Sequence, residues 1–279
     1  MPELPEVETA ARSLAPQVSG STITDVERLD WERMIETPAP GDFYALIAGR
    51  QIRRVYRRAK WVLLELDAGW TLAIHLRMSG NLTVQAADTP ARSHVHLILR
   101  LHDGRRIFFD DERKFGRVRL LDPIGLAQLD AAHGPEPLDP QFTPTNLAAI
   151  LAKRRTKIKV ALLDQHLIAG LGNIYVNEAL WLAQIHPAQP ADQLDQAQVL
   201  ALHQAICEVL THAIAHEGSS LRNYRNGYGR QGQNQEHFLV YDRAETPCQR
   251  CSTPLTRLVL AQRSTFVCPT CQPLLPQPT

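Results

Sequence analysis

The sequence lacks any apolar run close to the ~20 residues that a membrane-spanning helix needs. Its first ten residues, MPELPEVETA, carry three glutamates and no apolar core, so they do not resemble a signal peptide. Both absences predict a cytoplasmic protein with no membrane partner. A chain of 279 residues with 44% hydrophobic content is long enough for two domains and a small third.

Cysteine is scarce, and four of the five cysteines fall in one pattern, Cys248-x2-Cys251-x16-Cys268-x2-Cys271. This spacing is typical of a tetrathiolate zinc site. The alternative, two disulfides, requires an oxidising compartment that nothing at the N-terminus suggests. We therefore expect reduced cysteines and one structural zinc ion. Cys207 lies among apolar residues of a helical pattern and is predicted to be a buried small hydrophobe.

The formal net charge is only +1, but the charges are segregated along the chain. Residues 50–60 hold six basic residues and no acid, and residues 153–159 hold five basic residues. Residues 160–221 contain six acids and no Lys or Arg. This segregation favours a positive face that binds a polyanion. The alternative is that the basic runs are ordinary solvated surface.

Alternating apolar residues in the first half predict strands, and a short helix is expected from Pro5 to about Ala15. Ala68-Gly69 and Asp103-Gly104 each separate two such runs and predict hairpin turns. The result is a β-rich domain, a sandwich or a barrel, with a helix at its start. The predicted strands are 61–67, 70–76, 95–101, 105–111 and 117–121.

A Pro-rich passage at residues 133–144 marks a domain boundary, and helical periodicity follows it. Thr145 and Asp195 are the expected N-caps of the first and last helices, and Gly218 is the expected stop. The polar, Gly-rich stretch 223–235 is predicted to be a flexible loop. The predicted helices are 146–153, 158–163, 173–182 and 196–216. The predicted domains are 1–132, 133–236 and a zinc hairpin at 237–272, followed by a disordered tail at 273–279.

The first residues could carry chemistry. If Met1 is removed, Pro2 becomes a secondary amine, and an α-amine with a pKa near 8 is partly neutral at pH 7. Such an amine can attack a sugar anomeric carbon and form an iminium, which is an electron sink for β-elimination. Glu3 lies beside it and is suited to proton transfer. The alternative is that these residues are simply the start of a capped helix.

Several motifs occur in a fixed order along nearly the whole chain. They are MPELPEVET, Arg58-Ala59-Lys60, His75-Leu76-Arg77-Met78-Ser79-Gly80, Arg113-Lys114-Phe115-Gly116, GPEPL at 134–138, AGLGNIY at 169–175 and the four cysteines. From residue 2 to about residue 272 the chain closely resembles the bacterial formamidopyrimidine-DNA glycosylases, which repair oxidised purines.

The resemblance implies an α+β multidomain fold. It combines an N-terminal β-sandwich that carries an N-terminal helix with a C-terminal helix–two-turn–helix bundle and a four-cysteine zinc-finger β-hairpin. It also implies an enzyme that excises a damaged base and then cuts the strand by β,δ-elimination. Pro2 would be the Schiff-base nucleophile and Glu3 the proton donor. Lys60 would assist elimination, and Arg263 would grip a phosphate.

A glycosylase must extrude its target nucleotide from the duplex, which leaves a gap that other groups must fill. Met78, Arg113 and Phe115 match the intercalating residues of the family. An apolar wedge and an aromatic ring can stack on neighbouring bases, while a guanidinium can hydrogen-bond the orphaned base. Without the resemblance, Met78 and Phe115 would be read as core residues.

The remaining contacts to DNA are expected from helix geometry, charge and the resemblance. Asn173 ends a Gly-Leu-Gly-Asn segment before a helix, where free N–H groups can bind a phosphate, although such a segment alone can also be an ordinary turn. Each neutralised phosphate should add about one unit to the salt slope of binding. The full set of these expected contacts is His75, Arg92, Arg155, Lys159, Asn173 and Tyr241.

The sequence departs from the family pattern at Arg77, where glycine is expected, and at Arg92, which follows an alanine where a Lys-His pair is expected. Asn234 replaces an aromatic residue, and Asp242 replaces a glycine. Two alternatives therefore stay open: a relative closer to endonuclease VIII that prefers oxidised pyrimidines, and a DNA-binding protein without catalysis. The expected partner is damaged double-stranded DNA, bound by a monomer at the nucleoid.

Overall fold

The computed structural model describes residues 1–221 and 224–274, and its contacts divide the chain into two compact units. Unit 1 comprises Met1–Ala132 and Ile214–Gln235, and unit 2 comprises His133–Ala213 and Glu236–Thr279. The sequence predicted that residues 214–235 belong to the helical domain, whereas the contacts in the structure assign them to unit 1. Residues 222–223 of the predicted loop region and 275–279 of the predicted tail lie outside the described residues.

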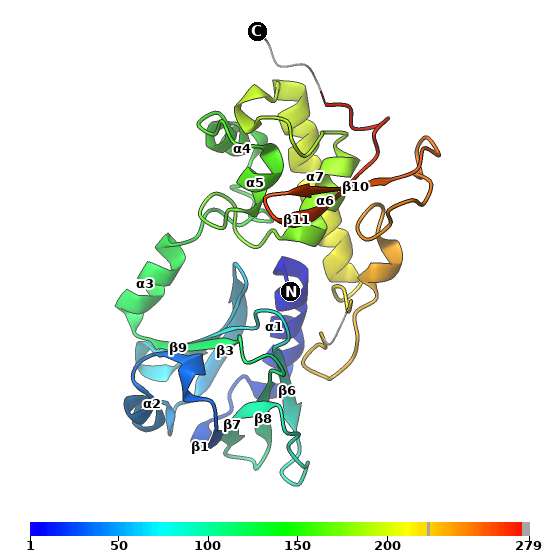
Figure 1. Cartoon of the computed structure of the whole chain (residues 1–279). Helices are drawn as coiled ribbons and strands as arrows, with labels where there is room; N and C mark the ends of the chain where they lie inside the picture. Colours follow the sequence, from blue (N-terminus) through cyan, green and yellow to red (C-terminus); the bar gives the residue numbers. More distant parts are fainter. Residues whose placement is uncertain (222–223, 275–279) are drawn as a thin grey trace. The chain divides into compact units, whose positions relative to one another are not determined.

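Unit 1 is built on two sheets and helix α1 (Figure 1). The five-stranded sheet has the order β2-β9-β5-β4-β3, and the four-stranded sheet has the order β1-β7-β8-β6. The bounds of the strands are β1 Ile23–Leu29, β2 Ile35–Thr37, β3 Ile52–Arg58, β4 Trp61–Leu66, β5 Thr71–His75, β6 Asn81–Gln85, β7 Val95–Leu101, β8 Arg106–Asp110 and β9 Arg117–Leu121. The helices of this unit are α1 Leu4–Val18, α2 Pro40–Ile47 and α3 Pro123–Ala131, with short 3-10 turns at Glu32–Met34 and Asp67–Gly69.

One apolar core joins both sheets and α1, with Leu14, Leu64 and Phe109 among its fully buried members. Burial of such side chains supplies the main stabilisation of the fold. The two expected hairpin turns form where predicted. Ala68 and Gly69 have φ of 51° and 79°, and Gly104 has φ of 86°, the left-handed conformation that tight turns require.

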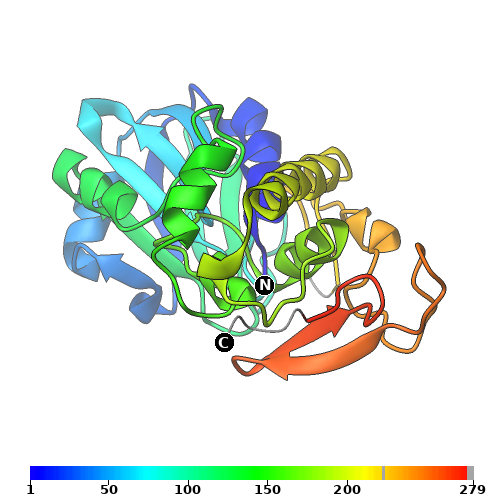
Figure 2. The same cartoon turned by 90° about the horizontal axis from the view of Figure 1, so that it is seen from above.

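Unit 2 holds four helices, a two-stranded hairpin and the cysteine motif. The helices are α4 Pro144–Leu151, α5 Ile158–Leu163, α6 Asn173–Leu182 and α7 Gln196–Ala215, and the hairpin strands are β10 Thr256–Leu260 and β11 Arg263–Val267. A 3-10 turn lies at Ala191–Gln193, and a second one, Asn234–His237, crosses the boundary between the two units. Helix α6 packs on β11, and Figure 2 shows the hairpin, in orange to red, as a separate two-stranded ribbon. Trp181, Val240 and Phe266 belong to a small apolar core on which the hairpin packs.

The predicted fold class is confirmed, with corrections at particular positions. Helix α4 begins earlier than expected because Thr143, and not Thr145, is its N-cap and forms a capping box with Asn146. Asp195 does act as a cap, since the Gln198 N–H donates to its Oδ1 (2.8 Å). Strand β3 was not predicted from the basic run 50–60, because five arginines obscure its apolar alternation.

No described helix is long and apolar enough to cross a membrane.

A partly buried ion pair attaches α1 to the five-stranded sheet. Arg57 of β3 donates from Nε to Glu8 Oε2 (2.9 Å), and Arg12 donates to Glu8 Oε1 (2.6 Å). Burial alone would raise the pKa of Glu8, but Arg57 and Arg12 together lower it below its ordinary value of 4.5. The ionised carboxylate therefore stabilises the native state.

We predict that Glu8→Gln lowers the free energy of unfolding most above pH 4.5, and that the difference from wild type disappears as the pH falls through the lowered native pKa. Protonation of the carboxyl removes the same attraction in the wild type, which is why the two curves converge. Urea unfolding at a series of pH values measures this. Glu65→Gln, which breaks an exposed ion pair with Arg54, should change stability by less than ~1 kcal/mol at every pH. A pH-independent effect of Glu8→Gln would contradict the argument.

Candidate functional site

The chain's first residues are buried at the start of α1. Pro2 and Glu3 are buried, with Glu3 only 3% exposed, whereas the Met1 side chain is 47% exposed. The Glu3 backbone N–H donates to Glu6 Oε2 (2.8 Å), which fixes the residue that precedes the helix. A proline nitrogen and a carboxyl group are thus held next to each other in a site that excludes most water.

Lys60 and His75 belong to the five-stranded sheet that packs on this helix, Lys60 in a turn and His75 at a strand end. Helix α1 packs on β3 and β4, and Lys60 occupies the tight turn between these two strands, where Ala59 has φ of 50°. Lys60 is 6% exposed. His75, at the end of β5, lies opposite Trp61 and contacts its ring edge-on (5.0 Å between centroids). His75 Nδ1 accepts the Arg77 N–H (3.0 Å), so the ring fixes the start of the loop that follows β5.

Two adjoining loops carry the expected wedge. Met78 and Phe115 are 40% and 43% exposed, and the Arg113 guanidinium lies over the Phe115 ring at 4.8 Å. Ser79 joins the loops, because its hydroxyl donates to the buried Asp111 carboxylate and accepts the Arg113 N–H (3.2 Å). These side chains are therefore not core residues. An exposed thioether, a guanidinium and an aromatic ring are presented together on a rigid base.

Backbone geometry explains why glycine is expected at two of the positions where this sequence departs from the family pattern. Arg77 has φ of 53° and Asp242 has φ of 59°, so both occupy the left-handed region in which glycine is unstrained. Close packing explains a retained glycine in the same loop. A Cβ on Gly80 would lie 2.5 Å from the Leu76 carbonyl oxygen.

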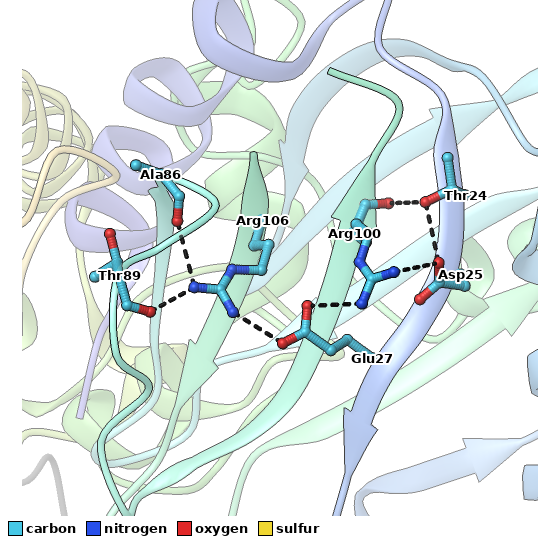
Figure 3. Close-up of polar contacts among 7 residues, drawn as sticks. All are labelled: Thr24, Asp25, Glu27, Ala86, Thr89, Arg100 and Arg106. Carbon is cyan, nitrogen blue, oxygen red and sulfur yellow. Dashed lines mark hydrogen bonds and ion pairs between the residues drawn. The ribbon is translucent and has the colours of Figure 1, made fainter. Parts of the chain in front are cut away.

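A polar cavity of about 580 Å³ opens on the face of β6 and β8 in unit 1, and Arg92 and Arg225 contribute cations to it. Burial raises the pKa of Asp110 in its wall, while Arg92 opposes the rise. Figure 3 shows how Arg106 fixes the neighbouring loop: its guanidinium donates to Glu27 Oε1 (2.8 Å) and to the carbonyl oxygens of Ala86 and Thr89. Arg92 is exposed at this rim, where a phosphate could reach it.

The four cysteines of the motif meet in unit 2. Their sulfur atoms lie within 4.8 Å of one another, and none forms a disulfide. Three Sγ–Sγ separations are 3.4–3.9 Å. A tetrahedral zinc ion with Zn–S bonds of about 2.3 Å requires sulfur atoms about 3.8 Å apart, so the donor set fits one Zn²⁺. With all four positions filled by thiolates, the ion is structural.

Arg263 stands at the tip of the hairpin that this cluster holds. It is exposed and begins β11 after the turn residues Ala261 and Gln262, which have φ of 49° and 59°. The next carbonyl, that of Ser264, accepts hydrogen bonds from Lys159 Nζ (2.9 Å) and from Asn173 Nδ2 (3.0 Å). The hairpin is thus attached directly to the helices at the residue after Arg263.

The expectation that Lys159 contacts a phosphate needs correction. Its side chain is fully buried, and Nζ also donates to Thr265 Oγ1 (2.8 Å). The amine is directed into the protein because the hairpin covers it. Asn173 is partly buried, and its Oδ1 is a buried oxygen with no hydrogen-bond partner among the described residues.

Arg155 and Tyr241 occupy different environments. Arg155 is exposed in the segment between α4 and α5, as a phosphate contact requires. Tyr241 is half-buried, and its ring contacts Phe266 of the hairpin edge-on (5.3 Å between centroids). The buried Glu178 carboxylate accepts the N–H groups of residues 239–241 and holds this segment against α6.

Sequence reasoning missed one group of residues. Glu6, Ser219, Tyr224 and Asn234 are all buried in unit 1 and connect the predicted loop to the first turn of α1. Only the Glu3-x-x-Glu6 spacing, which resembles a capping box, could have indicated a role for Glu6.

Comparisons with known proteins match this arrangement. Three family models cover the chain in order: formamidopyrimidine-DNA glycosylase N-terminal domain at residues 1–118, its H2TH domain at 133–225, and the zinc finger found in FPG and IleRS at 246–274. A formamidopyrimidine-DNA glycosylase of Chloroflexus aurantiacus is 63% identical over 278 residues, with 100% of both chains covered. The chain belongs to the formamidopyrimidine-DNA glycosylase family.

Other relatives agree with this assignment. The formamidopyrimidine-DNA glycosylase of a Roseiflexus species is 58% identical over 98% of this chain and 100% of its own. Among solved structures, the Lactococcus lactis Fpg in complex with abasic-site DNA superimposes with a TM-score of 0.90 at 36% identity, covering 97% of this chain and 99% of its own. The fold and the cysteine motif of the family are thus both present here.

We predict that chelation under reducing conditions removes one zinc ion per chain and disorders the hairpin, because four thiolates lose their common ligand. Zinc analysis and hydrogen exchange at β10 and β11 measure the two effects. Cys207→Ser should keep its zinc, since Cys207 lies outside the cluster. Full zinc content in Cys268→Ser together with normal protection of the hairpin would contradict the assignment.

We predict that Lys159→Met leaves the salt slope of DNA binding unchanged but destabilises hairpin docking by about 1–3 kcal/mol, because the Ser264 carbonyl and the Thr265 hydroxyl each lose a donor. The matched variant Arg155→Met removes an exposed cation and should lower the slope by about one unit. Affinity measured over a range of salt concentrations, with proteolysis of the hairpin, separates the two roles. A slope lowered by Lys159→Met and not by Arg155→Met would reverse the correction.

Proposed function

We propose that Pro2 and Glu3 remove an oxidised purine from duplex DNA and that Pro2 then carries the cleavage of the strand. The chain is a base-excision repair enzyme of the oxidised-purine class, a bifunctional glycosylase and abasic-site lyase with one structural zinc ion. The observation that carries the residue assignment is the burial of Glu3, at 3% exposure, directly beside Pro2 at the start of α1.

The chemistry begins with loss of Met1, which exposes a neutral secondary amine at Pro2. Its lone pair forms a bond to C1′ of the sugar, and the base departs with the electrons of the glycosidic bond. Glu3 supplies the proton that this departure requires. The proline nitrogen then loses its proton, and the C1′–O4′ bond breaks as O4′ takes up a proton, which leaves an iminium between C1′ and the nitrogen. Loss of a proton from C2′ expels the 3′ oxygen, and loss of a proton from C4′ then expels the 5′ oxygen.

Lys60 and Arg263 assist this reaction. Lys60, in the turn before β4, is a buried cation that assists proton transfer during elimination. Arg263, exposed at the hairpin tip, grips the phosphate that leaves. The arginine fork can hold two phosphate oxygens at once, which stabilises the charge that develops on them.

The exposed wedge supports extrusion of the damaged nucleotide. Met78 and Phe115 insert beside the gap, and Arg113 hydrogen-bonds the base left without a partner. Arg92, Arg155 and the N-terminus of α6 at Asn173 bind phosphates. His75 and Tyr241 act indirectly, by holding the segments that carry these groups. We propose that the enzyme acts as a monomer in the cytoplasm, at the nucleoid.

We predict that incubation with an 8-oxoguanine:cytosine duplex and borohydride traps a covalent complex, because reduction of the iminium makes the bond between Pro2 and C1′ permanent. Gel electrophoresis detects the adduct, and mass spectrometry confirms that Met1 is absent. Solved relatives include Lactococcus lactis Fpg with Fapy-dG-containing DNA and MutM with carbocyclic 8-oxo-G-containing DNA. No adduct from protein that lacks Met1 would overturn the proposal.

Two variants and a second substrate complete this experiment. Pro2→Gly should keep part of the trapping, since a primary amine remains, whereas Glu3→Gln should abolish base excision. Normal excision by Glu3→Gln would show that its assigned role is wrong. An oxidised-pyrimidine duplex tests the endonuclease VIII alternative, and preferential trapping of that duplex would favour it.

A further inference from the structure

A continuous set of hydrogen bonds connects the chain's Gly-rich loop to Glu3. Asn234 Nδ2 donates to Ser219 Oγ (3.0 Å), and the Ser219 N–H donates to Glu6 Oε1 (2.7 Å). The other oxygen of the same carboxylate, Oε2, accepts the Glu3 N–H (2.8 Å). These four residues, named here the loop relay, all belong to unit 1.

The loop relay is buried along its whole length. Glu3, Glu6, Ser219 and Asn234 are each 5% exposed or less. A buried carboxylate or amide is costly unless its polar atoms are paired, and a missing partner costs more than an ordinary hydrogen bond gains. A shift of the loop at Ser219 therefore cannot occur without a response at Glu6.

Two further contacts press the loop against the first turn of α1. The Tyr224 hydroxyl donates to the Glu6 carbonyl oxygen (2.8 Å), and burial raises the pKa of Tyr224 well above its usual value, which keeps this donor neutral. Gly218 has φ of 75°, and a Cβ there would lie 2.9 Å from Glu6 Oε1. The Asn234 N–H closes the base of the loop by donating to the Gly218 carbonyl oxygen (3.0 Å).

We propose that Asn234, Ser219 and Glu6 are positioning residues that make the placement of Glu3 depend on the conformation of the loop segments 218–221 and 224–234. The inference rests on the proposed role of Glu3 as the proton donor in base excision. The carboxylate of Glu6 is central because each of its oxygens accepts a backbone N–H from a different segment.

The inference distinguishes the two activities of the enzyme. Release of a base requires a proton from a well-placed Glu3. Cleavage at a preformed abasic site starts from a sugar that has already lost its base, so it requires Pro2 but no proton for a leaving base. Damage to the loop relay should therefore slow excision and spare cleavage at abasic sites.

The test compares single-turnover excision from an 8-oxoguanine duplex with cleavage of a preformed abasic duplex. For Asn234→Leu we expect excision to fall about 5- to 10-fold, the effect of about one hydrogen bond, with abasic cleavage within about twofold of wild type. Gln51→Leu is the matched control. It removes an amide hydrogen bond of the same length, to the Gly20 carbonyl oxygen (3.0 Å), in the same unit, and should change neither rate.

Two more variants locate the effect in the relay. Ser219→Ala removes only the hydroxyl and should lower excision as much as Asn234→Leu. The double variant should fall no further, because both remove one and the same hydrogen bond. Glu6→Gln turns one of two acceptors into a donor that faces an N–H group, so excision should fall about 10- to 100-fold.

The outcomes are separable. A wild-type enzyme that excises no oxidised purine would refute the proposed function. Normal excision by wild type, with excision by Asn234→Leu and Ser219→Ala within about twofold of it, would refute only the loop relay. A parallel fall of both activities in Ser219→Ala, or additive losses in the double variant, would show a general structural role and would also overturn the inference.

Discussion

The first turn of α1 is the constraint on which the rest of unit 1 depends. The proposed nucleophile and proton donor lie within three residues of the chain end, where a polypeptide is usually poorly ordered. Here Glu6 accepts the Glu3 N–H, Glu8 is paired with Arg57 of β3, and Tyr224 binds the Glu6 carbonyl oxygen. A helix held on several sides gives the chain end the rigidity that proton transfer and nucleophilic attack need.

Unit 2 uses the same principle with different chemistry. Its hairpin is too short to be stable alone, since isolated two-stranded hairpins are marginal in water. The cysteine cluster fixes one end, and the Ser264 carbonyl is held from the helices by Lys159 and Asn173. Arg263 is therefore supported both by a metal site and by hydrogen bonds, although its own side chain is exposed. Two independent attachments of the hairpin thus hold the backbone at Arg263 in a defined position, as binding of one particular phosphate requires.

Local patterns predicted much of this fold. The Asp103-Gly104 turn, the helix at Ile158–Leu163 and the cysteine cluster follow from spacing alone, since each is set by nearby residues. The burial of Lys159 could not be read in this way, because its partners lie more than 100 residues away on the hairpin. The basic run 153–159 shows where positive charge gathers in the sequence but not which way each side chain points. Only tertiary contacts show that Lys159, one of its five basic residues, points into the protein. The link from Asn234 to Glu3 is non-local for the same reason.

The burial of Pro2 has a practical consequence for work on the protein. An affinity tag fused before residue 2 would acylate the proline nitrogen. A tag placed after Thr279 lies beyond the cysteine cluster in sequence. Recombinant enzyme should therefore be labelled, immobilised or purified through its C-terminus. A fusion at the N-terminus would give a folded protein that binds DNA but leaves its lesion uncut.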